Sequence, residues 1–181
     1  MKRRRRSRLS SSDSTGAFCI ENNVRHTIVK ERMNNPAYYE RMSALLDELI
    51  ASRKARAIEY EAYLKAIASL VARVEAGRSD DTPKSLNTPG KRAVYDNLRN
   101  RAAARVPLGI AEPAVPYSAT TDAEALELAI QIDAAVKTSR HDAWRGVQAR
   151  EQVIKQALYG VLPDVAEVER IFLIVKAQRE Y

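Results

Sequence analysis

Large apolar residues recur every three or four positions along most of the 181-residue chain, which is the spacing of one face of an α-helix. The clearest case is the segment 35–77, where two such stripes flank the stretch 53–57 (RKARA), which contains no large apolar residue. Asn35 followed by Pro36 is a typical helix start, and Gly77 is a typical helix end. The segment therefore predicts a hairpin of two antiparallel helices.

Further helices are indicated by the same spacing and by polar residues that can cap a helix. Thr88 and Asp164 each stand directly before a helical pattern, and Thr121 with Glu124 has the spacing of a capping box. The predicted helices lie within residues 18–32, from residue 89 onward, and at residues 121–137, 147–162 and 164–181. The apolar stripe expected on the last of them consists of Val165, Val168, Ile171, Phe172 and Val175.

No segment shows the two-residue alternation of a β-strand, so the pattern predicts an all-α protein, an irregular bundle of about six helices. Residues 106–120 contain three prolines and one glycine, which predicts an extended connector. This connector would separate an N-terminal helical unit, residues 18–105, from a C-terminal three-helix unit, residues 121–181. Residues 1–17 are rich in Arg and Ser and are expected to be a disordered tail.

Positive charge is concentrated in that tail rather than spread over a surface. The formal net charge is +7, and residues 2–8 hold six basic side chains, while basic and acidic residues nearly balance in the rest of the chain. The tail could contact phosphate groups and release their counterions, or it could be a solvated leader without a partner. The candidate phosphate-binding residues are Arg3, Arg4, Arg5, Arg6 and Arg8.

The chain has a single cysteine, Cys19, so it cannot form an internal disulfide, and a reducing compartment is expected. The neighbouring residues Phe18 and Ile20 favour a small buried side chain at Cys19 over a reactive thiol. The basic start is followed by polar residues rather than by the apolar core of a secretion signal, and no apolar run approaches membrane-spanning length. We therefore expect a cytoplasmic protein with no membrane partner.

One predicted loop, SRHDAWRG at residues 139–146, carries residues of the kind found at catalytic sites. His141, Asp142 and Arg145 could form a general base or a phosphate clamp. The chain has only one other histidine, and no nucleophile motif adjoins the loop. The favoured interpretation is therefore structural: Trp144 would anchor the loop on the helices, and Asp142 would cap the next helix.

Four stretches, in order, resemble one known family. They are NPAYYERMS with LLDELI and YEAYL, within residues 35–64; TPKSLNTPGKRAVYDNL, residues 82–98; WRG, residues 144–146; and VKAQREY, residues 175–181. Together they are similar to the C-terminal helical region of the R (restriction and translocation) subunit of type I restriction-modification enzymes, over residues 18–181. The third stretch departs from the family's pattern, in which Gly commonly follows the Asp and Asn commonly follows Trp-Arg-Gly.

The resemblance implies a non-catalytic domain that docks a DNA-translocating and DNA-cleaving subunit onto the methyltransferase and specificity subunits, with DNA involved only indirectly. In the family, ATP and Mg²⁺ belong to other domains, and this chain has neither a P-loop nor a Glu-x-Lys nuclease triplet. We therefore expect no enzymatic activity, no cofactor and no metal in this chain, which would be a truncated or separately encoded piece. The alternative is a stand-alone helical nucleic-acid-binding or regulatory protein that uses its Arg-rich tail.

Overall fold

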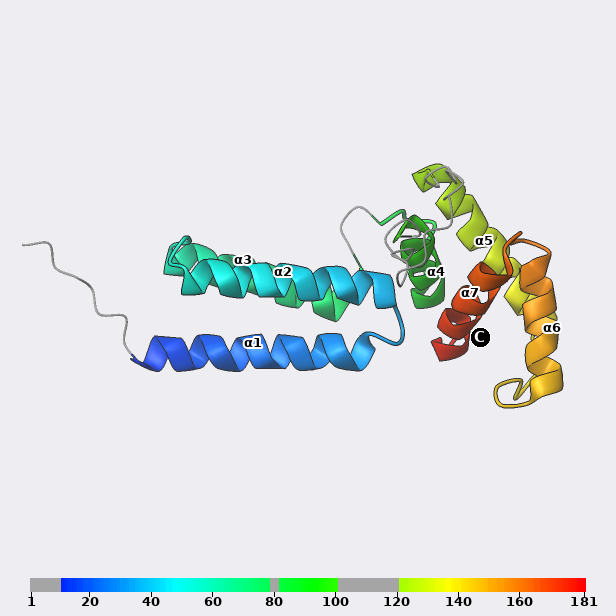
Figure 1. Ribbon diagram of the computed structural model, residues 1–181, viewed down its shortest axis with the longest axis horizontal. Helices are drawn as coiled ribbons and strands as arrows, with labels where there is room; N and C mark the ends of the chain where they lie inside the picture. The colour runs from blue at the N-terminus through cyan, green and yellow to red at the C-terminus, as the bar shows by residue number, and fades with distance from the viewer. Residues whose placement is uncertain (1–10, 79–81, 101–120) are drawn as a thin grey trace, which may run out of the picture.

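The computed structural model describes residues 11–78, 82–100 and 121–181, which form seven α-helices and, within these ranges, no strand (Figure 1). The prediction of an all-α bundle is confirmed, with one helix more than the six or so expected. The expected connector, residues 106–120, lies outside the described residues. The helices are α1 (Ser11–Glu31), α2 (Pro36–Lys54), α3 (Tyr60–Ala76), α4 (Pro89–Arg99), α5 (Asp122–Ser139), α6 (Gln148–Tyr159) and α7 (Val165–Ala177).

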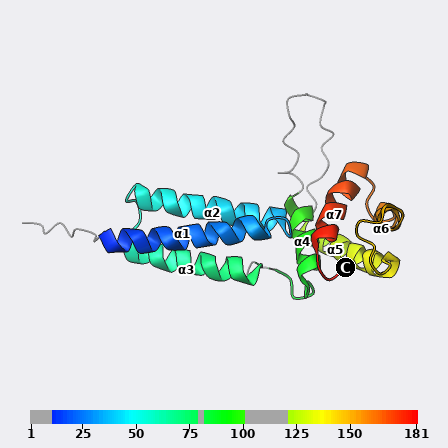
Figure 2. The same cartoon turned by 90° about the horizontal axis from the view of Figure 1, so that it is seen from below.

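Helices α1, α2 and α3 lie side by side and form an elongated three-helix arm, residues 11–76, in both views (Figures 1 and 2). The arm has its own core, made of the apolar stripes that predicted the hairpin. Its largest fully buried side chains are Tyr38, Met42, Leu46, Tyr63 and Ile67. The hairpin prediction for residues 35–77 is confirmed, since α2 and α3 pack against each other and a short turn joins them.

A buried carboxylate holds the three helices of the arm together near the turn between α2 and α3. The Glu21 side chain on α1 accepts hydrogen bonds from Arg53 Nε on α2, at 2.9 Å, and from the Tyr63 hydroxyl on α3, at 2.7 Å. Burial, reinforced by the bond to Glu21, raises the pKa of Tyr63. A buried charge is tolerated only when it is paired in this way, so Glu21 fixes how α1 sits on the hairpin.

Helices α4 to α7 form the second body, which we call the head, residues 82–100 and 121–181. Its core gathers buried residues of all four helices, such as Val94, Ile132, Leu158 and Ile171. The expected boundary placed α4 with the hairpin, in the unit 18–105. The structure instead places the apolar residues of α4 in the head core, while other residues of this helix contact α2. Helix α4 is buried on almost every side, so it joins the two bodies.

The predicted cap residues stand where helices begin and end. The Asn35 and Thr88 side chains accept from the third main-chain N–H that follows each of them, and Thr121 and Glu124 form the full capping box. Gly77 adopts the left-handed conformation, with φ of 59°, that ends a helix at low cost. Asp164 caps α7, with its side chain accepting from the N–H of Ala166.

The first helix differs from its prediction. Helix α1 has 21 residues and begins at Ser11, inside the stretch 1–17 that was expected to be disordered. Its buried residues Ala17, Val24 and Ile28 follow a helical spacing, so packing on the arm extends the helix beyond the expected range. Cys19 is exposed rather than buried, because it lies on the outer side of this stripe. Residues 1–10, with all five tail arginines, lie outside the described part.

No helix among the described residues is long and apolar enough to cross a membrane.

Candidate functional site

Trp144, in the loop singled out by its sequence, lies in the head core with 2% of its surface exposed. Its ring packs beside Phe172 of α7, with 6.0 Å between the ring centroids. Its indole N–H donates a hydrogen bond to the main-chain oxygen of Tyr181, at 3.1 Å. A buried indole needs such an acceptor, so the residue ties the loop to the last residues of the sequence.

The other residues of this loop divide between structural contacts and solvent. Arg145 donates from Nε to the main-chain oxygen of Lys176, at 2.9 Å, and from Nη2 to that of Gln178. Both acceptors lie at the C-terminal end of α7, where a cation is favourable. His141 and Asp142 are exposed, so the structure does not gather the four residues into one catalytic arrangement.

The expectation that Asp142 caps the next helix is wrong. Helix α6 starts after Val147 without any side-chain cap. The preceding N–H, that of Gly146, donates instead to the Glu151 carboxylate at 2.7 Å. The hydrogen bond from Lys176 to this carboxylate, assisted by the one from Gly146, lowers the pKa of Glu151. Glu151, in the first turn of α6, thus supplies the hydrogen-bond acceptor for the Gly146 N–H of the preceding loop.

The last four residues of the sequence form hydrogen bonds with several distant segments. Gln178 Nε2 donates to the main-chain oxygen of Asn34, at the end of α1, at 2.5 Å. The Tyr181 hydroxyl donates to the Asp133 carboxylate of α5 at 2.9 Å. Burial, together with this bond, raises the pKa of Tyr181. The segment therefore links the arm to two sides of the head.

Gly90, at the start of α4, is the tightest point of this arrangement. Its N–H donates to the Glu180 carboxylate at 2.9 Å. A Cβ atom added at Gly90 would collide with Glu180 Oε1, and it would lie 2.8 Å from the Tyr181 ring carbon Cε2. Only a residue without a side chain lets residues 180 and 181 lie across the start of this helix.

A buried polar network joins the arm to the head where α2 meets α4. Asn35 Nδ2 donates to the Asp96 carboxylate at 2.8 Å, and Asn97 Nδ2 donates to Asn35 Oδ1 at 3.0 Å. Arg41 of α2 adds a longer contact to Asp96, at 3.3 Å. Burial raises the pKa of Asp96, and the hydrogen bond from Asn35 opposes this shift. The Asn35 side chain thus caps α2 and also holds α4 against it.

Parts of the four sequence stretches that carry the family resemblance come together in this region, whereas YEAYL of the first stretch lies at the start of α3, at the other end of the arm. Asn35 belongs to the first stretch, Gly90 and Asp96 to the second, Trp144 to the third and Tyr181 to the fourth. Their contacts cross up to 90 positions of sequence, which no local pattern could indicate. We call this meeting point of arm and head the junction. Its polar residues and its glycine serve packing and hydrogen bonding between segments.

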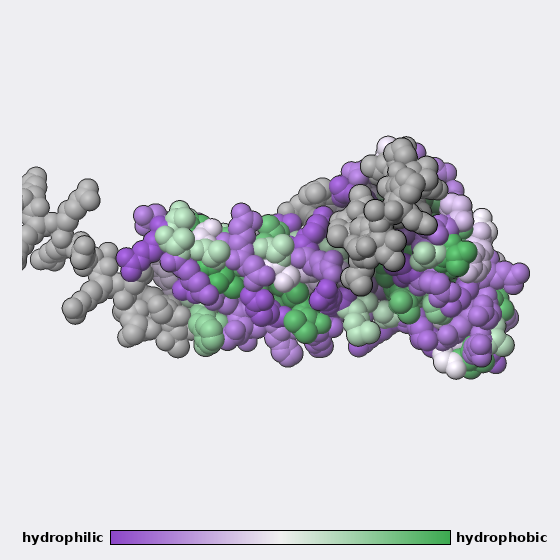
Figure 3. Space-filling model, in the orientation of Figure 1, coloured by the Kyte–Doolittle hydropathy of each residue, from purple (hydrophilic) through white to green (hydrophobic). Residues whose placement is uncertain are grey.

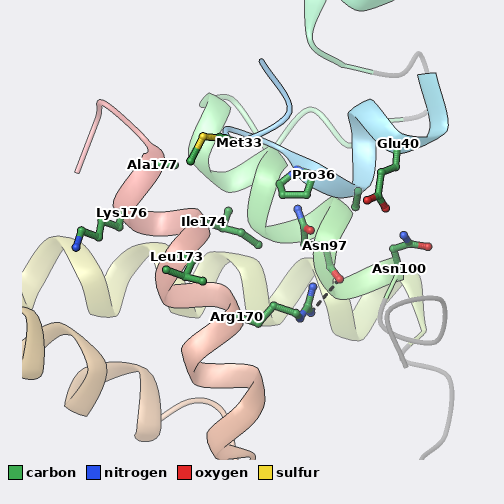
Figure 4. A pocket seen from close by; sticks show the side chains of 11 residues that line it. Met33, Pro36, Glu40, Asn97, Asn100, Arg170, Leu173, Ile174, Lys176 and Ala177 are labelled. Atoms are coloured by element: carbon green, nitrogen blue, oxygen red, sulfur yellow. Dashed lines mark hydrogen bonds between the residues drawn. The ribbon is translucent and has the colours of Figure 1, made fainter. Parts of the chain in front are cut away.

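A cleft of about 930 Å³ opens beside the junction, between α2, α4 and α7 (Figure 4). Two large apolar side chains on its wall face solvent: Met33 is 78% exposed and Leu173 is 65% exposed. The Arg170 side chain points across the cleft and donates to the main-chain oxygen of Asn97, at 3.1 Å (Figure 4). The other residues that line the cleft are Pro36, Ala37, Glu40, Asn100, Ile174, Lys176 and Ala177.

Sequence reasoning did not find this cleft, since Leu173 falls outside the predicted stripe of α7 and Met33 lies between predicted helices. The visible surface of the molecule is mostly hydrophilic, with hydrophobic side chains in separate patches (Figure 3). Exposed apolar side chains with a polar rim are typical of protein-binding surfaces. The cleft is therefore the best candidate for a docking site.

Within the three described ranges, no three His, Cys, Asp or Glu side chains lie close enough together to hold a metal ion. Comparisons with protein-family models, with curated proteins and with solved structures found no match to this chain.

Proposed function

We propose that this chain is a docking module similar in role to the C-terminal helical region of the R subunit of type I restriction-modification enzymes. In this role it binds the methyltransferase and specificity subunits and connects them with the parts that translocate and cut DNA. The chain itself is not an enzyme, and the ATP and Mg²⁺ used in restriction bind to other domains. It acts in the cytoplasm, as part of a defence against foreign DNA.

The observation that carries this proposal is that residues from each of the four resembling stretches meet at the junction. If the resemblance were a chance match between two helical sequences, the matching residues would be exposed as often as buried. Here they supply interlocking contacts instead: the N–H of Gly90 bonded to Glu180, the Asn35–Asp96 pair, and Trp144 bonded to the main chain of Tyr181. A shared set of buried contacts is expected where two proteins share one fold.

The cleft gives this module a surface suited to a protein partner. Met33 and Leu173 offer exposed apolar contact area, and Glu40, Arg170 and Lys176 supply a polar rim. Protein interfaces have the same design, in which a few apolar anchors are surrounded by polar groups that keep water out. The cleft also lies beside the junction, so a partner bound there would contact the chain where the arm meets the head.

Co-elution from a size-exclusion column at moderate salt tests the proposal directly. The chain is mixed with the methyltransferase and specificity subunits of a type I system from the same genome. We expect one shared peak that contains all three proteins. Separate peaks, with the chain folded and helical by circular dichroism, would overturn the proposal.

Two substitutions on one helix then locate the docking surface. Leu173→Asp puts a charge into the cleft, whereas Val165→Asp puts the same charge on α7 outside it, at a side chain that is 61% exposed. Because both residues face solvent, both variants should remain folded. We expect Leu173→Asp to abolish co-elution and Val165→Asp to preserve it. Equal behaviour of the two variants would show that the cleft is not the docking surface.

A further inference from the structure

We propose that the exposed segment 140–150 of the head, which joins the loop after α5 to the first residues of α6 and is called the loop below, binds the phosphate backbone of double-helical nucleic acid. The loop lies at the opposite end of the molecule from the start of α1 (Figure 1). This inference does not depend on the docking function proposed above, because it concerns a different surface and a different partner.

Three arginines of the loop are held by neutral acceptors. Arg140 Nη1 donates to the main-chain oxygen of Glu180 at 2.6 Å, and Arg150 Nη1 donates to that of Asp142, also at 2.6 Å. Arg145 donates to the main-chain oxygens at the end of α7. A carbonyl oxygen orients a guanidinium group without cancelling its charge. All three side chains are exposed, so their positive charges are accessible to an anionic partner.

Two exposed arginines elsewhere on the described surface, by contrast, are paired with carboxylates. On the arm, Arg25 lies 2.6 Å from Asp47 and Arg32 lies 2.7 Å from Glu40. These ion pairs neutralise each other locally, in keeping with the near balance of charge in the body of the chain. The three arginines of the loop differ from these two, because their hydrogen-bond acceptors carry no charge.

The acidic groups near the loop compensate only part of this charge. Glu151 forms an ion pair with Lys176 at 2.7 Å, and Glu180 accepts from the N–H of Gly90. Farther along, the Asp133 carboxylate already faces Lys91 and Lys137. Asp142 is the one exposed carboxylate within residues 140–150. Three arginines against two carboxylates without a cationic partner, Asp142 and Glu180, give the region a net positive charge.

The chemistry of this patch favours a phosphate backbone over other anionic partners. A guanidinium group presents five N–H donors in a planar fork that matches phosphate oxygens, and each arginine of the loop keeps some of these donors for a partner. The loop's aromatic residue, Trp144, is buried, so it offers neither a stacking platform for unpaired bases nor an aromatic anchor for a protein. Contacts to the backbone of a duplex need neither feature.

The test measures binding of a short fluorescent DNA duplex over a series of salt concentrations. Arg3, Arg4, Arg5, Arg6 and Arg8 are first replaced by serine in the full chain, which removes tail charge from the comparison. In this background we expect binding that weakens steeply with salt, and weaker binding of a single strand of the same sequence. The double variant Arg140→Gln/Arg150→Gln should make the slope of log K against log salt shallower by about 2, roughly one unit for each phosphate that is no longer neutralised.

A matched control removes the same charge from the arm. Arg25→Gln/Arg32→Gln also deletes two exposed arginines, so an effect of net charge alone would weaken binding equally. We expect this control to leave the slope of log K against log salt unchanged. The variant Arg140→Lys/Arg150→Lys, which keeps both charges, should retain most of the original slope. Equal losses in the two Gln double variants, or absence of duplex binding in the tail-substituted chain, would overturn the proposal.

A second measurement needs no substitution in the head. Hydrogen–deuterium exchange of the tail-substituted chain, with and without the duplex, should show slower exchange in residues 140–150 and no change in α1. Slower exchange confined to the arm, or equal binding of single-stranded and duplex DNA, would contradict the assignment of this loop to a duplex backbone.

Discussion

The Glu180 carboxylate accepts a hydrogen bond from the main-chain N–H of Gly90, 90 positions earlier in the chain, at 2.9 Å. This hydrogen bond places a negative charge at the start of α4, where the helix dipole favours it. It also brings the Glu180 and Tyr181 side chains so close to α4 that a Cβ at position 90 would force them to shift. The relationship gives the first prediction.

Gly90→Ala should destabilise the protein by about 1–3 kcal/mol, the usual cost of an extra group in a tightly packed site. The new methyl group would collide with the Glu180 carboxylate and with the Tyr181 ring. Thermal unfolding followed by circular dichroism measures the change. Gly16→Ala is the matched control, because nothing lies within 4 Å of its added Cβ in α1. That change should raise stability by up to about 1 kcal/mol, since alanine favours helix.

Asn35→Ala should cost about 2–4 kcal/mol in the free energy of unfolding, because it removes a helix cap and leaves buried polar partners unpaired. The affected partners are Asp96 and Asn97 on α4. Urea unfolding gives the value. Asn34→Ala serves as the control, because its side chain bonds only to the nearby Glu31. Equal stability losses in the two variants would argue against a special role of Asn35 in the junction.

Stability should fall as the pH rises above 10. Burial raises the pKa of Tyr38 to about 12, and burial likewise raises that of Tyr181. In the unfolded chain these groups ionise near pH 10, whereas in the folded protein they stay protonated, so ionisation favours unfolding. The effect for Tyr38 lies between pH 10 and about 12. Tyr38→Phe should flatten the pH dependence there, while lowering stability at neutral pH, because it removes the hydrogen bonds to the main-chain oxygens of Arg73 and Arg78.

This prediction is checked by melting temperatures at a series of pH values for both proteins, with tyrosinate absorbance recorded in parallel. A wild-type melting temperature that stays constant across this range would contradict it.

Deletion of residues 178–181 should expose Trp144 and loosen the head while the arm keeps its helices. Trp144 is the chain's one tryptophan, and it loses its acceptor when Tyr181 is removed. Its fluorescence should therefore shift to longer wavelength, and the melting temperature should fall. Deletion of residues 1–8 should change neither signal. An unshifted spectrum in the first deletion would show that the Tyr181 hydrogen bond does not keep Trp144 buried.

Helix positions were predictable because their signals are local. Asn35 with Pro36, Gly77 and Asp164 each act on main-chain groups within one turn, so the sequence pattern alone locates the helix ends. Burial was less predictable within a stripe. Val165 was expected to face inward but is 61% exposed, because it stands at the first position of α7, beyond the core.

The junction and the cleft could not be predicted, because both depend on how distant segments meet. Nothing near Asn35 in sequence indicates that its amide binds Asp96, 61 positions away. In the same way, α4 has a narrow apolar stripe that fits either body, and tertiary packing alone assigns its apolar residues to the head. The start of α1 ahead of residue 18 has the same origin, since Ala17 packs in the core of the arm.

The length of the arm makes it a lever. At 1.5 Å per residue, the 21 residues of α1 span about 30 Å, so a rotation of about 10° at the junction would move the far end of the arm by about 5 Å. The hydrogen bonds of Asn35 with Asp96 and Asn97 stabilise the junction about which the arm would rotate. Weakening them would displace the far tip of the arm more than any group near the break, so the largest positional error would appear at the end most distant from the mutation.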